Sequence, residues 1–232
     1  ADCIERAQRA DERRLGRTAA PASPRRRMDA GAIGSIAAGY PLQRRGPRDA
    51  RLLGTIEYLL AAHRVHGGFF QEMIHSGVNA YLTLHMAQVL LRAGDARGLE
   101  LIDAVAALAT DTGQWPEAIH PRTLGGCMGD GQHVWAAAEW VAMMRNAFCR
   151  EEGDRLVLGA GIQPRWLVPG EVLFFGPTPT PWGAVSVTLH PDAAGRHTVE
   201  WRIDGTDPAG IRIALPGCAP LEVAGDVRSA RL

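Results

Sequence analysis

Apolar residues recur at the spacing of helices through the first part of the chain. Leu52, Ile56 and Leu59 form one such face, and Pro47 is suited to open its helix. Ser76 is the expected N-cap of the next helix. The pattern predicts helices over 28–38, 47–66, 77–93, 97–109 and 131–149, after a polar, Arg-rich helix over 1–17.

After Gly153 the helical period gives way to the alternation that is typical of strands. Clusters of Gly, Pro and Asp separate the segments, which favours an antiparallel sheet or sandwich. Strands are predicted over 155–158, 171–175, 184–190, 198–203, 210–215 and 221–223. The predicted fold class is therefore α+β, with an N-terminal helix and linker over 1–27, a helical-hairpin domain over 28–152 and a β-sandwich-like domain over 153–232.

The predicted helices are joined alternately by short polar loops and by longer loops rich in Gly and aromatic residues. If the helical hairpins form a ring, alternate loops share one rim. The loops that contain Glu72 and Glu117 would then converge on one pocket.

Composition excludes several classes of function. The 232 residues are 46% hydrophobic, which suits a globular core. The formal net charge is +0, whereas proteins that bind nucleic acids usually carry an excess of positive charge. No apolar run is long enough to cross a membrane. Four cysteines without a CxxC pair fit reduced thiols in a cytoplasm, and a single disulfide is the alternative. The histidines His63, His66, His75 and His85 lack the HExxH carboxylate, and no phosphate-binding glycine motif is present, so no metal or other cofactor is expected.

The segment 112–140 carries the most specific chemistry. Glu117 stands between Trp115 and His120, with a proline on both sides, which predicts a rigid loop rather than a helix. Carboxylates do acid and base work on sugars, while aromatic faces stack on pyranose rings. Alternatively, Glu117 is an ordinary surface carboxylate and Trp115 packs in the core. His120 could likewise have a structural role instead of a contact with substrate.

Four further residues are candidates for sugar binding. Asp130 and His133 stand where a glycine-rich turn enters the last predicted helix, and Asp29 stands at the start of the first. Capping alone explains an aspartate at either position. Glu72 lies on a loop predicted to share the rim with Glu117.

Short motifs follow one another in a fixed order over 28–146. They are Met28-Asp29-Ala30, Gly39-Tyr40-Pro41, Pro47-Arg48, Thr55, Gly67-Gly68, Gly77, Asn79-Ala80-Tyr81-Leu82, Arg92-Ala93-Gly94-Asp95 and the loop from Gly113 to Glu117. This ordered set resembles the second half of the glucoamylase-like, six-hairpin (α/α)6 family of glycoside hydrolases.

The resemblance implies an inverting glycosidase in which Glu117 is the general base. The general acid of that family would precede residue 1, and no residue of this chain matches it. The resemblance therefore implies the C-terminal half of an enzyme, either a fragment or a chain that needs a partner. The region from Gly153 onward is similar to the C-terminal β-domain of rhamnosidases and disaccharide phosphorylases, so hydrolysis and phosphorolysis both stay open.

Two other functional classes are considered. The same aromatic loops could bind glycan without turnover, as a non-catalytic carbohydrate-binding module. A helical scaffold that binds protein is disfavoured, because the helices have no fixed repeat period. A partial ring would expose apolar helix faces, so the missing N-terminal half or a second copy is the expected protein partner, beside an oligo- or polysaccharide substrate.

Overall fold

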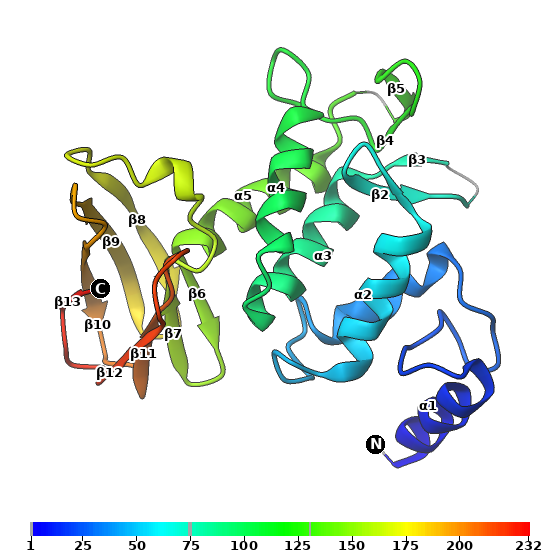
Figure 1. The fold of residues 1–232 in the computed structure, drawn as a ribbon, viewed down its shortest axis with the longest axis horizontal. Coiled ribbons are helices and arrows are strands. Elements are labelled where there is room, and N and C mark those ends of the chain that lie inside the picture. Colours follow the sequence, from blue (N-terminus) through cyan, green and yellow to red (C-terminus); the bar gives the residue numbers. More distant parts are fainter. Residues whose placement is uncertain (1, 74–75, 130) are drawn as a thin grey trace. The chain divides into compact units, whose positions relative to one another are not determined.

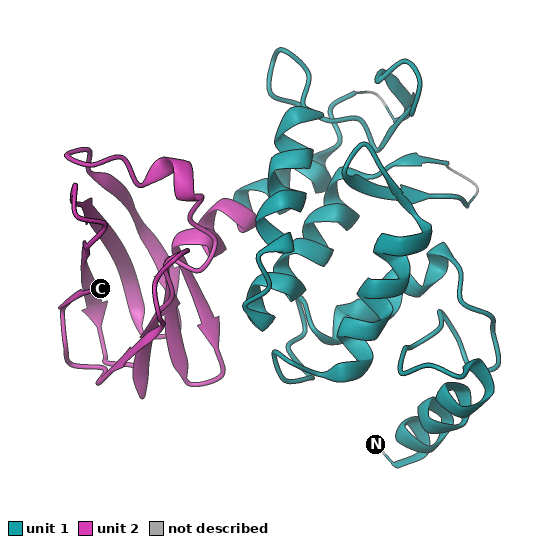
Figure 2. Ribbon diagram, viewed as in Figure 1, with its two compact units in different colours: residues 1–141 teal, residues 142–232 magenta. Residues whose placement is uncertain are grey.

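The computed structural model describes residues 2–73, 76–129 and 131–232, shown as a ribbon in Figure 1. The chain divides into two compact units, Ala1–Val141 and Ala142–Leu232 (Figure 2). Helices dominate the first unit and strands dominate the second. The predicted α+β class is confirmed at this level.

The first unit combines helices with a sheet of very short strands. Its helices are α1 (Asp2–Leu15), the 3-10 helix η1 (Ala30–Ala38), α2 (Ala50–Ala62), α3 (Ala80–Ala93), α4 (Arg97–Ala107) and the beginning of α5 (Val134–Phe148). Its strands, in sheet order, are β1 (Arg64–Val65), β2 (Gly68–Gln71), β3 (Gly77–Val78), β4 (Ala118–Ile119) and β5 (Gly126–Met128). Strands of two or three residues are too short to show an alternating pattern, so the sequence did not predict this sheet.

Side-chain caps and a glycine define the helix ends. Asp49 caps α2, because its carboxylate accepts hydrogen bonds from the backbone N–H groups of Arg51 and Leu52. Gly94 ends α3 in the left-handed conformation at φ +76°. The chain then returns along α4, and α3 and α4 form a helical hairpin around a buried apolar core.

The cap predicted at Ser76 is wrong. Asn79 caps α3 instead, because its side chain accepts a hydrogen bond from the backbone N–H of Leu82 at 3.0 Å. Residues 77–78 pair as strand β3, so the helix begins three residues later than a cap at Ser76 would place it. The hydroxyl of Ser76 donates to the carbonyl of Met73.

The second unit contains two four-stranded sheets, of order β13-β10-β9-β8 and β12-β11-β7-β6. In chain order its elements are β6 (Cys149–Glu152), β7 (Arg155–Leu158), the 3-10 helix η2 (Pro164–Trp166), β8 (Leu173–Thr180), β9 (Gly183–Pro191), β10 (His197–Gly205), β11 (Gly210–Ile213), β12 (Leu221–Val223) and β13 (Ser229–Arg231). Leu156, Val187, Trp201 and Ile211 belong to one buried apolar cluster, which draws on both sheets. The pairs are antiparallel except for β7 with β11, which is parallel.

Two strands of this unit differ from the predicted ones for clear physical reasons. β8 extends through Pro177 and Pro179 because it is an edge strand, where missing N–H donors are tolerated. β6 follows α5 without a turn and pairs with β7, so its residues look like a continuation of the helix in sequence.

The chain passes from the first unit to the second after Val141, within α5, whereas the sequence predicted a boundary near residue 152. Phe148, in the last turn of α5, stacks on Trp166 and Phe175 of the second unit, with ring centroids 6.3 Å and 5.0 Å apart. The end of α5 therefore packs with the strands of the second unit. Its helical sequence period placed it in the predicted helical-hairpin domain.

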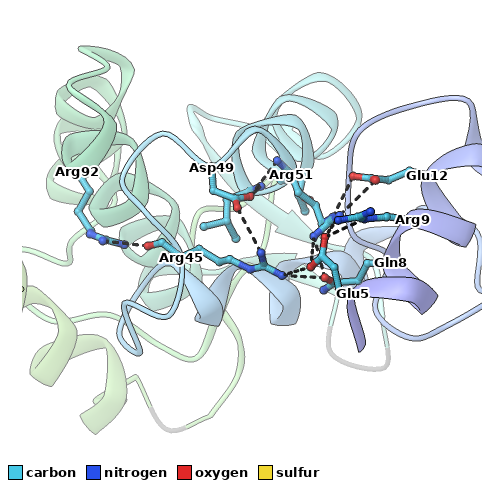
Figure 3. A network of polar contacts seen from close by, with 10 residues as sticks. Glu5, Gln8, Arg9, Glu12, Arg45, Asp49, Arg51 and Arg92 are labelled. Carbon is cyan, nitrogen blue, oxygen red and sulfur yellow. Dashed lines mark hydrogen bonds and ion pairs between the residues drawn. The ribbon is translucent and has the colours of Figure 1, made fainter. Parts of the chain in front are cut away.

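Within the first unit, ion pairs join α1 to Arg45 and to Arg51 on α2 (Figure 3). Arg51 on α2 bonds to Glu12, with Nε–Oε1 at 2.9 Å, and to Glu5, with Nη2–Oε1 at 3.2 Å. Arg45 also reaches Glu5, with Nη2–Oε2 at 2.8 Å. Hydrogen bonds from Arg45, and then from Arg51, lower the pKa of Glu5 from 4.5 to about 2.

The contact of α1 is expected to weaken in acid. Because the folded-state pKa of Glu5 is depressed, its contribution is complete above the unfolded pKa and is lost as the pH falls from about 4.5 towards about 2. Hydrogen exchange of the α1 amides, corrected for the intrinsic pH dependence of exchange, measures this loss. In the Glu5→Gln variant that pH dependence should be reduced. Protection of α1 that stays constant across this interval in the unmodified chain would contradict the assignment.

Candidate active site

Strand pairing positions Glu117 at the beginning of α3. Val78 pairs with Ile119, which brings the residues before β4 beside the residues after β3. The amide of Asn79 then donates from Nδ2 to the backbone carbonyl of Glu117 at 3.1 Å, while its Oδ1 caps α3. One side chain thus fixes both the Glu117 loop and the first turn of the helix.

The side chain of Glu117 is half-buried, and the described chain provides no hydrogen bond or ion pair to its carboxylate. Tyr81 lies within range of the charge of Glu117. Burial first, and then this negative charge, raises the pKa of the Tyr81 phenol. Gly129 also lies close to Glu117, because an added Cβ would lie 3.2 Å from the Cβ of Glu117. A carboxylate in this setting is available to water or to a ligand.

A group of rings surrounds Tyr81. Its ring centroid lies 5.4 Å from that of His133 and 5.8 Å from that of Trp135. Trp135 is 64% exposed, which is unusual for an indole in contact with two other rings. Nδ1 of His133 is buried and finds no hydrogen-bond partner among the residues described. The rings therefore present an accessible aromatic surface next to Glu117.

A second carboxylate, Glu139, connects α5 to α3 and to Tyr40, two residues after η1. It accepts hydrogen bonds from the Tyr40 hydroxyl at 3.3 Å and from Nε2 of Gln88 at 3.2 Å. Nε2 of His85 lies 3.3 Å from Oε2 of Glu139. The His85 ring also contacts Tyr81 edge-on, at 5.9 Å between centroids, so this polar group adjoins the aromatic surface.

Trp115 is a buried residue. Its indole N–H donates to the carbonyl of Val105 at 2.8 Å, and its ring packs on Trp140 at 5.1 Å between centroids. Its exposed fraction is 5%, so almost no surface is left on which a sugar ring could stack.

His120 stabilises its own turn. Nδ1 accepts hydrogen bonds from the backbone N–H groups of Arg122 at 3.2 Å and Thr123 at 3.3 Å. These contacts require the proton on Nε2 when the ring is neutral. The imidazole shapes the turn that follows β4.

Asp29 and Glu72 have partners away from the aromatic surface. Asp29 caps η1 by accepting from the N–H of Gly31 at 2.9 Å, and it pairs with Arg26 at 2.8 Å. The exposed Glu72 lies 3.8 Å from Nδ1 of the buried His63. Burial, and then the negative charges of Asp29 and Glu72, raise the pKa of Tyr58, whereas burial and then the charge of Glu117 raise the pKa of Tyr81. Asp130 lies outside the described residues.

Several residues of this site were not among the sequence candidates. None of Tyr40, Tyr81, His85, Trp135 and Glu139 was assigned to a site from the sequence. The spacing of Tyr81 and His85, four residues apart, places them on one helix face and was the available signal.

Comparison with the models of known protein families and with curated proteins found no match. Within the described ranges, no three His, Cys, Asp or Glu side chains form a group that could hold a metal ion. No helix in the same ranges is long and apolar enough to span a membrane.

Proposed function

We propose that this chain is part of an inverting glycoside hydrolase, in which Glu117 is the general base and the neighbouring rings bind the sugar. The observation that carries the proposal is the half-buried Glu117 carboxylate, unpaired within the described chain, beside the Tyr81 ring and the exposed Trp135. Aromatic faces stack on the apolar faces of pyranose rings, and a fixed carboxylate activates water.

Glu117 accepts a proton from water as the oxygen of that water bonds to the anomeric carbon. The glycosidic C–O bond breaks, and the leaving oxygen takes a proton from an acid that this chain does not supply. Tyr81 and Trp135 hold the ring, and His133 contacts its hydroxyls.

The partial helical ring is a further part of the proposal. The α3–α4 hairpin supports it, and so does the first half of α5, where Val134 and Val141 are 73% and 67% exposed. Contiguous exposed apolar residues mark interaction sites. Further helical hairpins, or a second copy of the chain, would cover them.

The second candidate is a non-catalytic carbohydrate-binding module, and the absence of a matching acid favours it for this chain alone. A panel of maltotriose, cellotriose, laminaritriose and xylotriose separates the two functions when binding and reducing-sugar release are measured on one preparation. Binding with product supports the hydrolase, and binding without product supports the module. Release that depends on added phosphate indicates a phosphorylase. A chain that binds no probe contradicts both candidates.

Replacing Trp135 by Ala is expected to weaken binding of the panel sugar about tenfold, because the exposed indole provides the largest stacking surface of the site. Isothermal titration measures the change. Phe174→Ala is the matched control, since Phe174 is an aromatic residue of the second unit that is 62% exposed. Equal affinities of the two variants would contradict the role of Trp135.

A further inference from the structure

One face of α3 carries polar and aromatic side chains in place of apolar ones. Tyr81, His85 and Gln88 follow at intervals of four and three residues, which puts them on the same side of the helix. Tyr81 contacts the rings beside Glu117, whereas His85 and Gln88 contact Glu139. The polar face therefore continues from the proposed sugar site along α3.

The contacts of His85 leave one ring nitrogen available. Nε2 faces the Glu139 carboxylate at 3.3 Å, and the ring edges meet Tyr40 and Tyr81 at centroid distances of 5.5 Å and 5.9 Å. The side chain keeps 27% of its surface exposed. No residue in the described part of the chain makes a hydrogen bond to Nδ1.

Glu139 determines how the His85 ring is oriented. An ionised carboxylate only accepts hydrogen bonds, and Glu139 already accepts them from Tyr40 and Gln88. Nε2 of His85 lies 3.3 Å from the same carboxylate, and a proton on Nε2 is favoured there because a lone pair would face the negative charge. In the neutral ring, Nδ1 then has a free lone pair that can accept a hydroxyl proton.

We propose that His85 binds a sugar hydroxyl through Nδ1 and that Glu139 is the residue that positions the imidazole for this contact. The inference rests on the proposed function and extends its site from Glu117, Tyr81 and Trp135 along the face of α3. The ligand class is a neutral sugar with a hydroxyl directed at α3.

His85→Gln tests the contact through Nδ1. The Gln amide can still donate to Glu139 from the position of Nε2 but has no acceptor where Nδ1 lies. Titration of the panel sugar into the full chain is expected to show binding weakened about five- to tenfold. A purely structural His85, which only holds Glu139, would be replaced by Gln with unchanged affinity, and that result overturns the proposal.

Glu139→Gln tests the positioning role through a double-mutant cycle. The substitution should weaken binding about three- to tenfold in the unmodified chain and have little further effect in the H85Q background, because Glu139 acts through His85. Equal losses in both backgrounds would overturn the positioning role. If Glu139→Gln does not fold, the affinity of His85→Gln still decides the hydroxyl contact.

His190→Gln provides the matched control. Nε2 of His190 lies 3.5 Å from Glu200 on the strands of the second unit, and both side chains are exposed. This variant should bind the probe as the unmodified chain does. If the unmodified chain binds no panel sugar, the proposed function fails and this inference fails with it. Binding that is unaffected by His85→Gln overturns this inference alone.

Discussion

Replacing Glu117 by Gln is expected to lower the rate of glycoside hydrolysis about 10²–10⁴-fold, which is the usual contribution of a general base. The amide is nearly the same size as the carboxylate but cannot take a proton from water. Because the described chain makes no hydrogen bond or ion pair to this carboxylate, the fold should not change. The loss should therefore appear in turnover, with sugar affinity and the thermal midpoint close to those of the unmodified chain.

Reducing-sugar release from the panel oligosaccharides measures this loss, in whichever assembly of the chain proves active. Glu100→Gln is the control, because Glu100 is an exposed carboxylate on α4 that pairs with Arg64 at 3.3 Å. The anomeric configuration of the first product, read by NMR, is expected to be inverted. A Glu117→Gln rate within about tenfold of the unmodified rate would rule out the general-base role.

Replacing Gly54 by Ala is expected to lower the free energy of unfolding by about 1–3 kcal/mol, the usual range for overpacking. Helix propensity alone predicts the opposite, since Ala stabilises a helix interior by about 1 kcal/mol relative to Gly. The added Cβ would lie 1.9 Å from the carbonyl oxygen of Thr18. The backbone of residues 18–20 would have to move, which strains the 2.9 Å hydrogen bond from the N–H of Ala20 to Thr55 Oγ1.

Urea unfolding followed by the helical circular dichroism signal gives the two free energies. Gly34→Ala is the control, because no atom lies within 4 Å of its added Cβ. Its free energy of unfolding should stay within about 0.5 kcal/mol of the unmodified chain. A Gly54→Ala chain that is as stable as the unmodified one would show that residues 18–20 do not pack on α2.

Local chemistry made some of the fold predictable. Asp49 and Gly94 are strong signals for the start of α2 and the end of α3, and both act as such. The strands at 155–158 and 221–223 were predicted with their observed limits. The short strands of the first unit could not be predicted, because their pairing depends on partners far away in sequence.

The parts of the site that depend on neighbouring residues in sequence could be predicted. The exposure of individual side chains could not, because it depends on how the elements pack. Pro116 and Pro121 indicated a stiff loop around Glu117, and the structure holds that loop against α3. Trp115 and Trp135 cannot be distinguished by composition or spacing, yet one is 5% and the other 64% exposed. Tertiary packing determines which of the two tryptophans is buried, and it also determines the contact between Glu139 and His85.

The double use of Asn79 limits how this protein can be redesigned. Aspartate caps helices as well as asparagine does, so a stability calculation on α3 alone would accept Asn79→Asp. An ionised aspartate has no donor for the carbonyl of Glu117 and would add a second negative charge beside it. The stability of the helix and the proposed reaction thus depend on the same position. A substitution that preserves the helix would still disturb Glu117.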